Sequence, residues 1–310
     1  MSTQPSPYLP HRASTIEQIT IRGTMPYRIH RWAPKNGSVL NAPPLLLTHG
    51  WMDIGASFQR CVDYLSADRE VIALDWRGFG GSRGSQPVDS YSFHDYYGDL
   101  DAVIDYISPA SPIDLLGHSM GGNIVMVYAG TCPTRVRRLI NVEGFGLPRS
   151  DPSAASARLA QWLQGLKSPT TLRSFASEQE VVDHLKRRSP LLEQEYGRWL
   201  ARHWAELGED GRRHIAADAV HKRVNPLIYR CDEVVSTWEK IQAPVLLVEG
   251  GHDGQGWQGN DQYPRSEFEG RLSKVRSVER RVIDRAGHMV HLDQPEALAI
   301  AIEAFLSAAR

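Results

Sequence analysis

Cysteine is scarce in this chain of 310 residues, and the spacing of its few copies argues against two classes of protein. Cys61, Cys132 and Cys231 are far apart in the sequence and odd in number. A disulfide-stapled scaffold needs paired cysteines, and no CxxC or other metal-ligand spacing occurs. We therefore expect three reduced thiols and no bound metal.

Long apolar runs and an excess of either charge are also missing. No run approaches the ~18 apolar residues of a membrane-spanning helix, and the start, MSTQPSPYLPHRAS, lacks the apolar stretch of a secretory signal. The 35 Lys and Arg residues are balanced by 36 Asp and Glu residues, for a formal net charge of -1. This balance gives no electrostatic basis for binding nucleic acid or an anionic membrane. We expect a cytoplasmic protein with a small-molecule partner, either a monomer or a homodimer, with a flexible N-terminal tail over 1–15.

The sequence does contain a regular alternation of short apolar runs and amphipathic stretches. Helices are expected at 57–66, at 92–107, directly after residue 119 and at the C-terminus. Strands are expected at 17–23, 26–32, 45–50, 70–76, 113–119, 136–144, 243–251 and 279–288. Strands that alternate with helices indicate an α/β fold with a mostly parallel sheet covered on both faces.

This alternation is interrupted between about 147 and 238. Stretches such as SAASARLAQWLQGL, EQEVVDHLKRRS and LLEQEYGRWLARHWAELG have helical periodicity, and no strand is evident between them. We therefore expect a core domain made of 16–146 and 239–310, interrupted by a helical insertion over 147–238.

The segment DLLGHSMGGNIVMVYAG, residues 114–130, places a single serine among glycines between an apolar strand and an apolar helix. The motif G-x-S-x-G alone is weak, but a buried strand before it and a helix after it are the setting of a nucleophile elbow. Gly117 and Gly121 remove side chains that would clash in so tight a turn. Ser119 is therefore the expected nucleophile, beside the positive end of the following helix.

A serine hydroxyl needs a base, and histidine is the residue type that serves at neutral pH. His288 follows the last expected strand directly, which is where this arrangement requires the base. His291, three residues further on, is the weaker candidate. His49, His118 and His252 do not follow the final strand.

The base needs a carboxylate that fixes its tautomer and stabilises its charge. Asp253 lies in the loop after the strand 243–251 and is the first choice. Glu143 ends the strand 136–144 and is the alternative acid. Both fit the chain order serine, acid, histidine, so the sequence leaves the two open.

The oxyanion of an acyl-transfer reaction needs two backbone N–H donors. Met120, directly after the serine, supplies one by its position. The other is expected from Trp51, which follows the His49-Gly50 pair at the end of a buried strand.

Together, THGWMD, LDWRGFGGS, GHSMGG and AGHMVHLDQPE resemble the successive strand-end motifs of the α/β-hydrolase fold, and the likeness runs from about residue 25 to the C-terminus. The sequence is most similar to the serine-hydrolase-like and carboxylesterase-type members of that superfamily. The resemblance implies an eight-stranded sheet, a helical lid inserted after the sixth strand, and no cofactor.

A serine at the elbow predicts acyl transfer and argues against the dehalogenases and epoxide hydrolases of this fold, which resemble it but use aspartate there. We expect a serine hydrolase of a small to medium carboxylic ester. The same triad also serves thioesterases, carbon–carbon bond hydrolases and haloperoxidase-like members, and the fold also hosts non-catalytic ligand-binding homologues.

Overall fold

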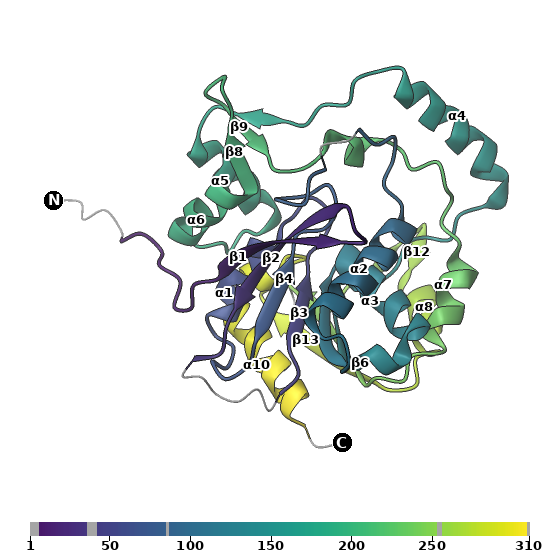
Figure 1. Ribbon diagram of the computed structural model, residues 1–310. Coiled ribbons are helices and arrows are strands. Elements are labelled where there is room, and N and C mark those ends of the chain that lie inside the picture. The colour runs from purple at the N-terminus through teal and green to yellow at the C-terminus, as the bar shows by residue number, and fades with distance from the viewer. Residues whose placement is uncertain (1–5, 36–41, 85–86, 253–255, 309–310) are drawn as a thin grey trace.

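An eight-stranded sheet forms the centre of the molecule (Figure 1). The computed structural model describes residues 6–35, 42–84, 87–252 and 256–308. The strands of the sheet are β1 (Thr15–Ile21), β2 (Met25–Trp32), β3 (Leu45–Thr48), β4 (Val71–Leu74), β5 (Ile113–His118), β6 (Val136–Val142), β10 (Val245–Gly251) and β13 (Val278–Asp284). Their order is β1-β2-β4-β3-β5-β6-β10-β13. β2 pairs antiparallel with β1 and with β4, and all other neighbours pair parallel. The expected α/β fold with a mostly parallel sheet is confirmed.

Helices cover both faces of this sheet because alternate strand residues point to opposite sides and both sets are apolar. The helices of this part of the chain are α1 (Gln59–Val62), α2 (Phe93–Ile107), α3 (Met120–Thr131), α8 (Arg265–Leu272), α9 (Val290–Asp293) and α10 (Pro295–Ser307). On β3, Leu45 and Leu47 belong to the core beneath α1 and α10, whereas Leu46 belongs to the core beneath α2 and α3. No helix within the described ranges is long and apolar enough to cross a bilayer.

Residues 147–238, which we call the inserted segment, connect β6 to β10. They contain the helices α4 (Ala155–Leu166), α5 (Glu178–Arg188), α6 (Gln194–Trp204) and α7 (Cys231–Trp238). They also contain a small antiparallel sheet of β7 (Ser174–Phe175), β8 (Ala205–Leu207) and β9 (Arg213–Ile215), in the order β7-β9-β8.

The expectation of an insertion without strands was therefore wrong. The stretch that ends in WAELG has helical spacing, but α6 stops at Trp204 and the chain continues as β8. Gly211, with φ of +73°, lies in the turn that pairs β8 with β9. Strands of two or three residues are too short to show a period of two, so the sequence pattern could not reveal them.

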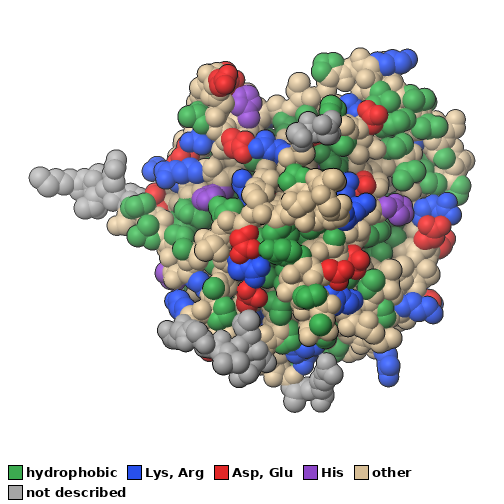
Figure 2. Space-filling view, viewed as in Figure 1, with side chains coloured by type: hydrophobic (Ala, Val, Ile, Leu, Met, Phe, Trp, Pro, Cys, Tyr) green, Lys and Arg blue, Asp and Glu red, His purple; other side chains and the backbone are tan. Residues whose placement is uncertain are grey.

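The inserted segment packs unevenly on the rest of the molecule. α5 and α6 bury apolar side chains such as Val182 and Leu200, whereas α4 buries none of its residues. In Figure 1, α4 stands apart at the upper right, and Figure 2 shows hydrophobic side chains at the surface in that region. α5 and α6 are thus integrated into the apolar core and α4 is not.

The described part of the N-terminal stretch is held against the sheet. The Arg12 guanidinium is buried and donates to the carbonyls of Trp32, at 2.6 Å, and Arg69, at 2.6 Å. Tyr8 donates its hydroxyl to Asp63. The expectation of a loose tail is therefore wrong at Tyr8 and Arg12. A buried guanidinium needs several acceptors at once, and Arg12 finds them in the carbonyls of Trp32 and Arg69.

A further two-stranded ribbon, β11 (Gly259–Asn260) and β12 (Tyr263–Pro264), precedes α8.

Candidate active site

Ser119 lies at a strained turn between β5 and α3. Its backbone has φ of +53° and ψ of -114°, a conformation that costs energy for a residue with a side chain. A Cβ at position 117 would lie 2.4 Å from the backbone of Gly121, and one at position 121 would lie 2.5 Å from the carbonyl oxygen of Thr48. The glycines around the serine are thus required by the close approach of the neighbouring backbone, as the sequence predicts.

Glu143 lies beside the serine at the end of the adjacent strand. β5 and β6 run parallel with His118 opposite Val142, and the Ser119 N–H donates to the Val142 carbonyl at 2.8 Å. The residue after each of these paired positions therefore leaves the same edge of the sheet. This register explains why the serine and the glutamate are neighbours although they are 24 positions apart in the sequence.

The Glu143 side chain is held by the turn on which it stands. Its own φ is +58°, and the Asn141 side chain brackets the turn by accepting from the Gly144 N–H, at 2.9 Å, and donating to the Gly144 carbonyl, at 2.7 Å. Its Oε1 accepts the N–H of Gly250 at 2.7 Å. The Glu143 side chain is only 7% exposed. One of its carboxylate oxygens is fixed by a backbone N–H, and the other faces the loop that carries His288, which we call the histidine loop.

His288 connects the two. Its Nε2 lies 2.9 Å from Ser119 Oγ, and its Nδ1 lies 3.0 Å from Glu143 Oε2. With Nδ1 donating to the carboxylate, Nε2 is free to accept the serine proton, which is the tautomer that a general base requires. The ring remains 44% exposed, so a substrate can reach it.

The other two candidates from the sequence, one for the acid and one for the base, have different outcomes in the structure. Asp253, the first-choice acid, lies outside the described residues. His291, the alternative base, is fully buried, and its Nε2 lies 3.3 Å from Asp53 Oδ2. Of the acid and base candidates, Glu143 and His288 are therefore the two for which the structure describes contacts with each other or with Ser119.

The loop after β3 lies against Ser119. A Cβ on Gly50 would stand 3.1 Å from Ser119 Cβ, so the glycine lets this loop approach the elbow closely. Trp51 and Met120, the two expected oxyanion donors, line the same cavity as Ser119. The indole N–H of Trp204, in the inserted segment, donates to the Met52 carbonyl at 3.0 Å and fixes the loop from the other side.

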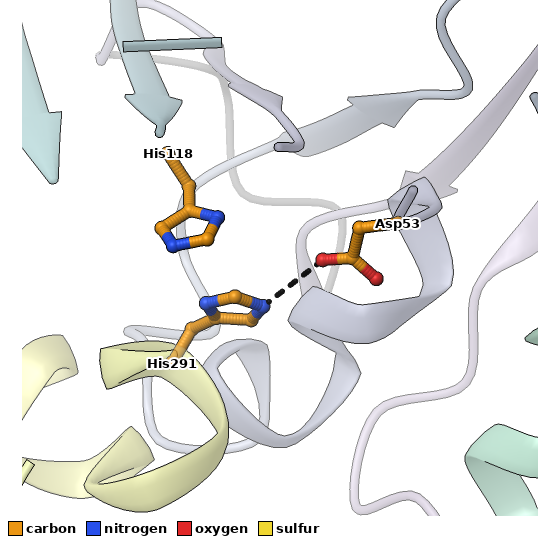
Figure 3. Close-up of side chains that lie close together, drawn as sticks. All are labelled: Asp53, His118 and His291. Atoms are coloured by element: carbon orange, nitrogen blue, oxygen red, sulfur yellow. Dashed lines mark ion pairs between the residues drawn. The ribbon is translucent and has the colours of Figure 1, made fainter. Parts of the chain in front are cut away.

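Behind the elbow lies a buried group of Asp53, His118 and His291 (Figure 3). The His118 Nε2 donates to the backbone carbonyl of His288 at 2.8 Å. Burial, with the neighbouring His291 and His288, holds the pKa of His118 well below its ordinary value, so the ring is neutral. His118 therefore joins the serine turn to the histidine loop independently of the contact between Ser119 and His288.

The same three side chains could in principle hold a metal ion, since one potential ligand atom from each lies within 4.8 Å of the others. Imidazole and carboxylate are ligands that zinc accepts. His118 supports His288 through Nε2 and His291 faces Asp53, while the Nδ1 atoms of both histidines have no hydrogen-bond partner among the described residues. Burial would raise the pKa of Asp53, but His291 and Ser57 outweigh it and hold that pKa below its ordinary value.

The histidine loop is held at a further point. The Gly287 N–H donates to Asp293 Oδ2 at 2.9 Å, and Ser189 of the inserted segment donates to Asp293 Oδ1 at 2.5 Å. Sequence reasoning missed the supporting roles of His118 and Asp293. The position of a histidine directly before the serine was the available signal, but its partner is a backbone carbonyl 170 residues away.

The serine opens into a cavity of about 310 Å³ beneath the inserted segment. Its walls include Tyr91, Asn123, Leu147 and His221 beside Ser119. The cavity is of the size that holds a small organic ligand. The geometry combines a positioned hydroxyl, an oriented imidazole and room for a substrate.

Comparison with known proteins identifies the family of this chain. Residues 45–301 match the profile described as the alpha/beta hydrolase family. The chain belongs to the alpha/beta hydrolase family. This alpha/beta hydrolase is 25% identical over 288 residues to a serine hydrolase-like protein of Dictyostelium discoideum, covering 89% of this chain and 77% of that protein.

Two further likenesses extend over nearly the whole chain. The 3-hydroxybutyrate-oligomer hydrolase of Cupriavidus necator is 27% identical over 316 residues, covering 96% of this chain and 98% of that protein. Among solved structures, the thioesterase domain from the curacin biosynthetic pathway superposes with a TM-score of 0.79 at 24% identity, covering 94% of this chain and 99% of that one. The latter likeness bears on the fold of this alpha/beta hydrolase alone.

Proposed function

We propose that this alpha/beta hydrolase cleaves carboxylic esters, with Ser119 as nucleophile, His288 as general base and Glu143 as the acid that orients it. The observation that carries the proposal is the pair of contacts of His288, 2.9 Å to Ser119 Oγ and 3.0 Å to Glu143 Oε2. Heavy-atom distances in this range are those required for proton transfer between nucleophile and base.

The proposed reaction has two half-reactions. The Ser119 Oγ attacks the ester carbonyl carbon while His288 Nε2 takes the hydroxyl proton, and the carbonyl electron pair moves onto oxygen. That oxygen would be stabilised by the N–H groups of Trp51 and Met120. When the C–O bond to the alcohol breaks, the imidazolium returns its proton to the leaving alkoxide, and an acyl-serine remains.

Hydrolysis of the acyl-serine repeats these steps with water. His288 takes a proton from the water as the hydroxide attacks the acyl carbon, and the serine leaves with the proton that His288 returns. In both halves the Glu143 carboxylate stabilises the positive imidazolium without itself becoming protonated. The scheme uses no cofactor.

We further propose that the inserted segment acts as a lid over this site. Its residues Val220, His221, Arg223 and Asn225 form one wall of the serine cavity. A wall from a separate segment limits which acyl groups can enter, while the triad itself remains common to many substrates. The named relatives that are hydrolases, including one that acts on 3-hydroxybutyrate oligomers, support hydrolysis of an ester.

The experiment that tests the proposal is hydrolysis of p-nitrophenyl esters, from acetate to decanoate, by the wild type and Ser119→Ala. We expect turnover in the wild type and a loss of about 10³-fold or more in the variant. Equal turnover in the folded variant would contradict the assignment of Ser119. An enzyme that neither hydrolyses these esters nor reacts with a fluorophosphonate would favour the non-catalytic, ligand-binding alternative.

A further inference from the structure

A second cavity of about 370 Å³ adjoins the one that contains Ser119. The two have three wall residues in common, Phe93, Leu147 and Asn225. The second cavity lies between α2 and α3 on one side and the stretch from Asn225 to α7 on the other. We call it the distal compartment, and the shared residues form its junction with the serine cavity.

One helix face runs through both compartments. Ser119, Met120 and Asn123 line the serine cavity near the start of α3, and Val127 and Thr131 line the distal compartment near its end. Positions 123, 127 and 131 of α3 are four residues apart, so they form a stripe along one side of the helix. At about 1.5 Å per residue, this stripe extends ~12 Å from Asn123, away from the end of α3 that follows Ser119.

The walls of the distal compartment are mainly apolar. Leu147 and Leu227 both line it and are 37% and 54% exposed, so their apolar side chains remain accessible to a ligand. Burial raises the pKa of Tyr229, another wall residue, to about 12. Further apolar wall residues are Phe93, Tyr97, Val127, Ile228 and Val234.

The charged groups of the distal compartment are already engaged. The exposed Arg230 and Glu233 pair with each other at 2.7 Å. The Arg158 Nε donates to the backbone carbonyl of Asn225 at 2.8 Å. No further carboxylate is among the described wall residues, so the surface left for a ligand is largely hydrocarbon.

The residues at the junction are fixed in position by hydrogen bonds. The Asn225 Nδ2 donates to the Tyr91 carbonyl at 2.6 Å. Arg271 donates to the Leu147 carbonyl at 2.7 Å, and the N–H of the preceding Gly146 donates to Asn123 Oδ1 at 2.8 Å. Phe93 begins α2, whose start is fixed by the capping box of Ser92 and Asp95. Walls that are fixed in this way lose little conformational freedom when a ligand binds against them.

We propose that the distal compartment binds the apolar chain of a medium-length acyl group whose carbonyl is attacked by Ser119. This inference rests on the proposed function and adds the substrate class, aliphatic esters of about eight to twelve carbons. An extended chain advances roughly 1.3 Å per carbon, given C–C bonds near 1.5 Å, so ten carbons span ~13 Å, about the length of the α3 stripe, and four carbons span only ~5 Å. Each methylene that leaves water there is worth about a fourfold gain in kcat/KM.

The test compares p-nitrophenyl decanoate with p-nitrophenyl butyrate in three enzymes. Val234→Trp places an indole in the distal compartment, and Val235→Trp makes the same change one residue along α7, at a position that does not line either cavity. We expect the decanoate-to-butyrate ratio of kcat/KM to fall at least about tenfold in Val234→Trp and to match the wild type in Val235→Trp. Thr131→Trp fills the compartment from α3 and serves if Val234→Trp does not fold.

A catalysis-independent readout separates this inference from the proposed function. Decanoic acid binding is measured by calorimetry in Ser119→Ala, with and without Val234→Trp or Thr131→Trp. Weaker binding of decanoic acid in the doubly substituted proteins supports the inference about the distal compartment, even if the wild type hydrolyses no ester. Absence of ester hydrolysis would overturn only the proposed function. If butyrate is hydrolysed but the ratio is the same in Val234→Trp and Thr131→Trp, the inference is overturned and the esterase proposal stands. Binding that is unaffected by both tryptophans would also overturn the inference.

Discussion

The carboxyl edge of the sheet and the inserted segment contribute to the same cavity but are built differently. At the sheet edge, Ser119 and Glu143 follow paired positions of two parallel strands, and their loops are fixed by backbone hydrogen bonds. In the inserted segment, a helix such as α4 buries no side chain, and the wall over the site is made of loop and short helical turns. The comparison indicates that Ser119 and Glu143 are positioned by strand register, whereas the shape of the cavity beside them depends on a segment with less uniform packing.

The largest effect is expected at the sheet edge, from Glu143→Gln. An amide can hold the ring, but it cannot stabilise the imidazolium and it favours the wrong tautomer, so kcat should fall about 10³- to 10⁴-fold. The loss should be similar for butyrate and decanoate esters, because it concerns the triad and not the chain. Steady-state kinetics with both esters measures it, with Asp253→Asn as the comparison. A greater loss of kcat in Asp253→Asn than in Glu143→Gln would move the acid to Asp253.

A stability comparison probes the uneven packing of the inserted segment. Leu200 in α6 is fully buried, so Leu200→Ala should lower the free energy of unfolding by about 2 to 5 kcal/mol. Leu163 in α4 is 47% exposed, so Leu163→Ala should change it by about 0.5 kcal/mol or less. Denaturant unfolding followed by tryptophan fluorescence measures both. Equal losses would mean that α4 is packed as firmly as α6, and the contrast within the segment would be wrong.

A smaller effect is expected from the support behind the triad. His118→Phe keeps a ring in place but removes the donor to the His288 carbonyl, and a small displacement of the base should lower kcat about 10- to 100-fold with KM unchanged. His118→Gln retains an N–H that can reach the same carbonyl, and it should recover part of the loss. A loss expressed in KM, or no recovery with glutamine, would indicate a merely structural role for His118.

Much of the fold could be predicted because its signals are local. The buried runs at 45–48, 71–74 and 245–251 and the Gly-flanked serine each identify an element from a few adjacent residues. The small sheet of the inserted segment could not be predicted, since its strands of two or three residues have no readable period. The stretch AADAVHKRV, over 216–224, has helical spacing in the sequence, but the structure has only a short 3-10 helix there, Ala219–Lys222.

The candidate site was predictable up to the point at which strand register matters. Ser119 and His288 follow from a motif and from chain order. The sequence favours Asp253 over Glu143 because Asp253 lies in the loop after the strand 243–251. The contact of Glu143 with His288 depends instead on how β5, β6 and β10 align. Asn141 and Gly144 are residue types that favour a turn, and both are present in the sequence. That this turn holds Glu143 in place follows only from the structure, in which the Asn141 side chain bonds the N–H and the carbonyl of Gly144.

The most direct test of the central claim is to treat the folded wild-type enzyme with a fluorophosphonate and locate the adduct by peptide mass spectrometry. The account predicts a single modification on Ser119, formed rapidly in the wild type and at least about 10²-fold more slowly in Glu143→Gln. Modification of another residue at a comparable rate, or none on Ser119 in protein that remains folded, would contradict it.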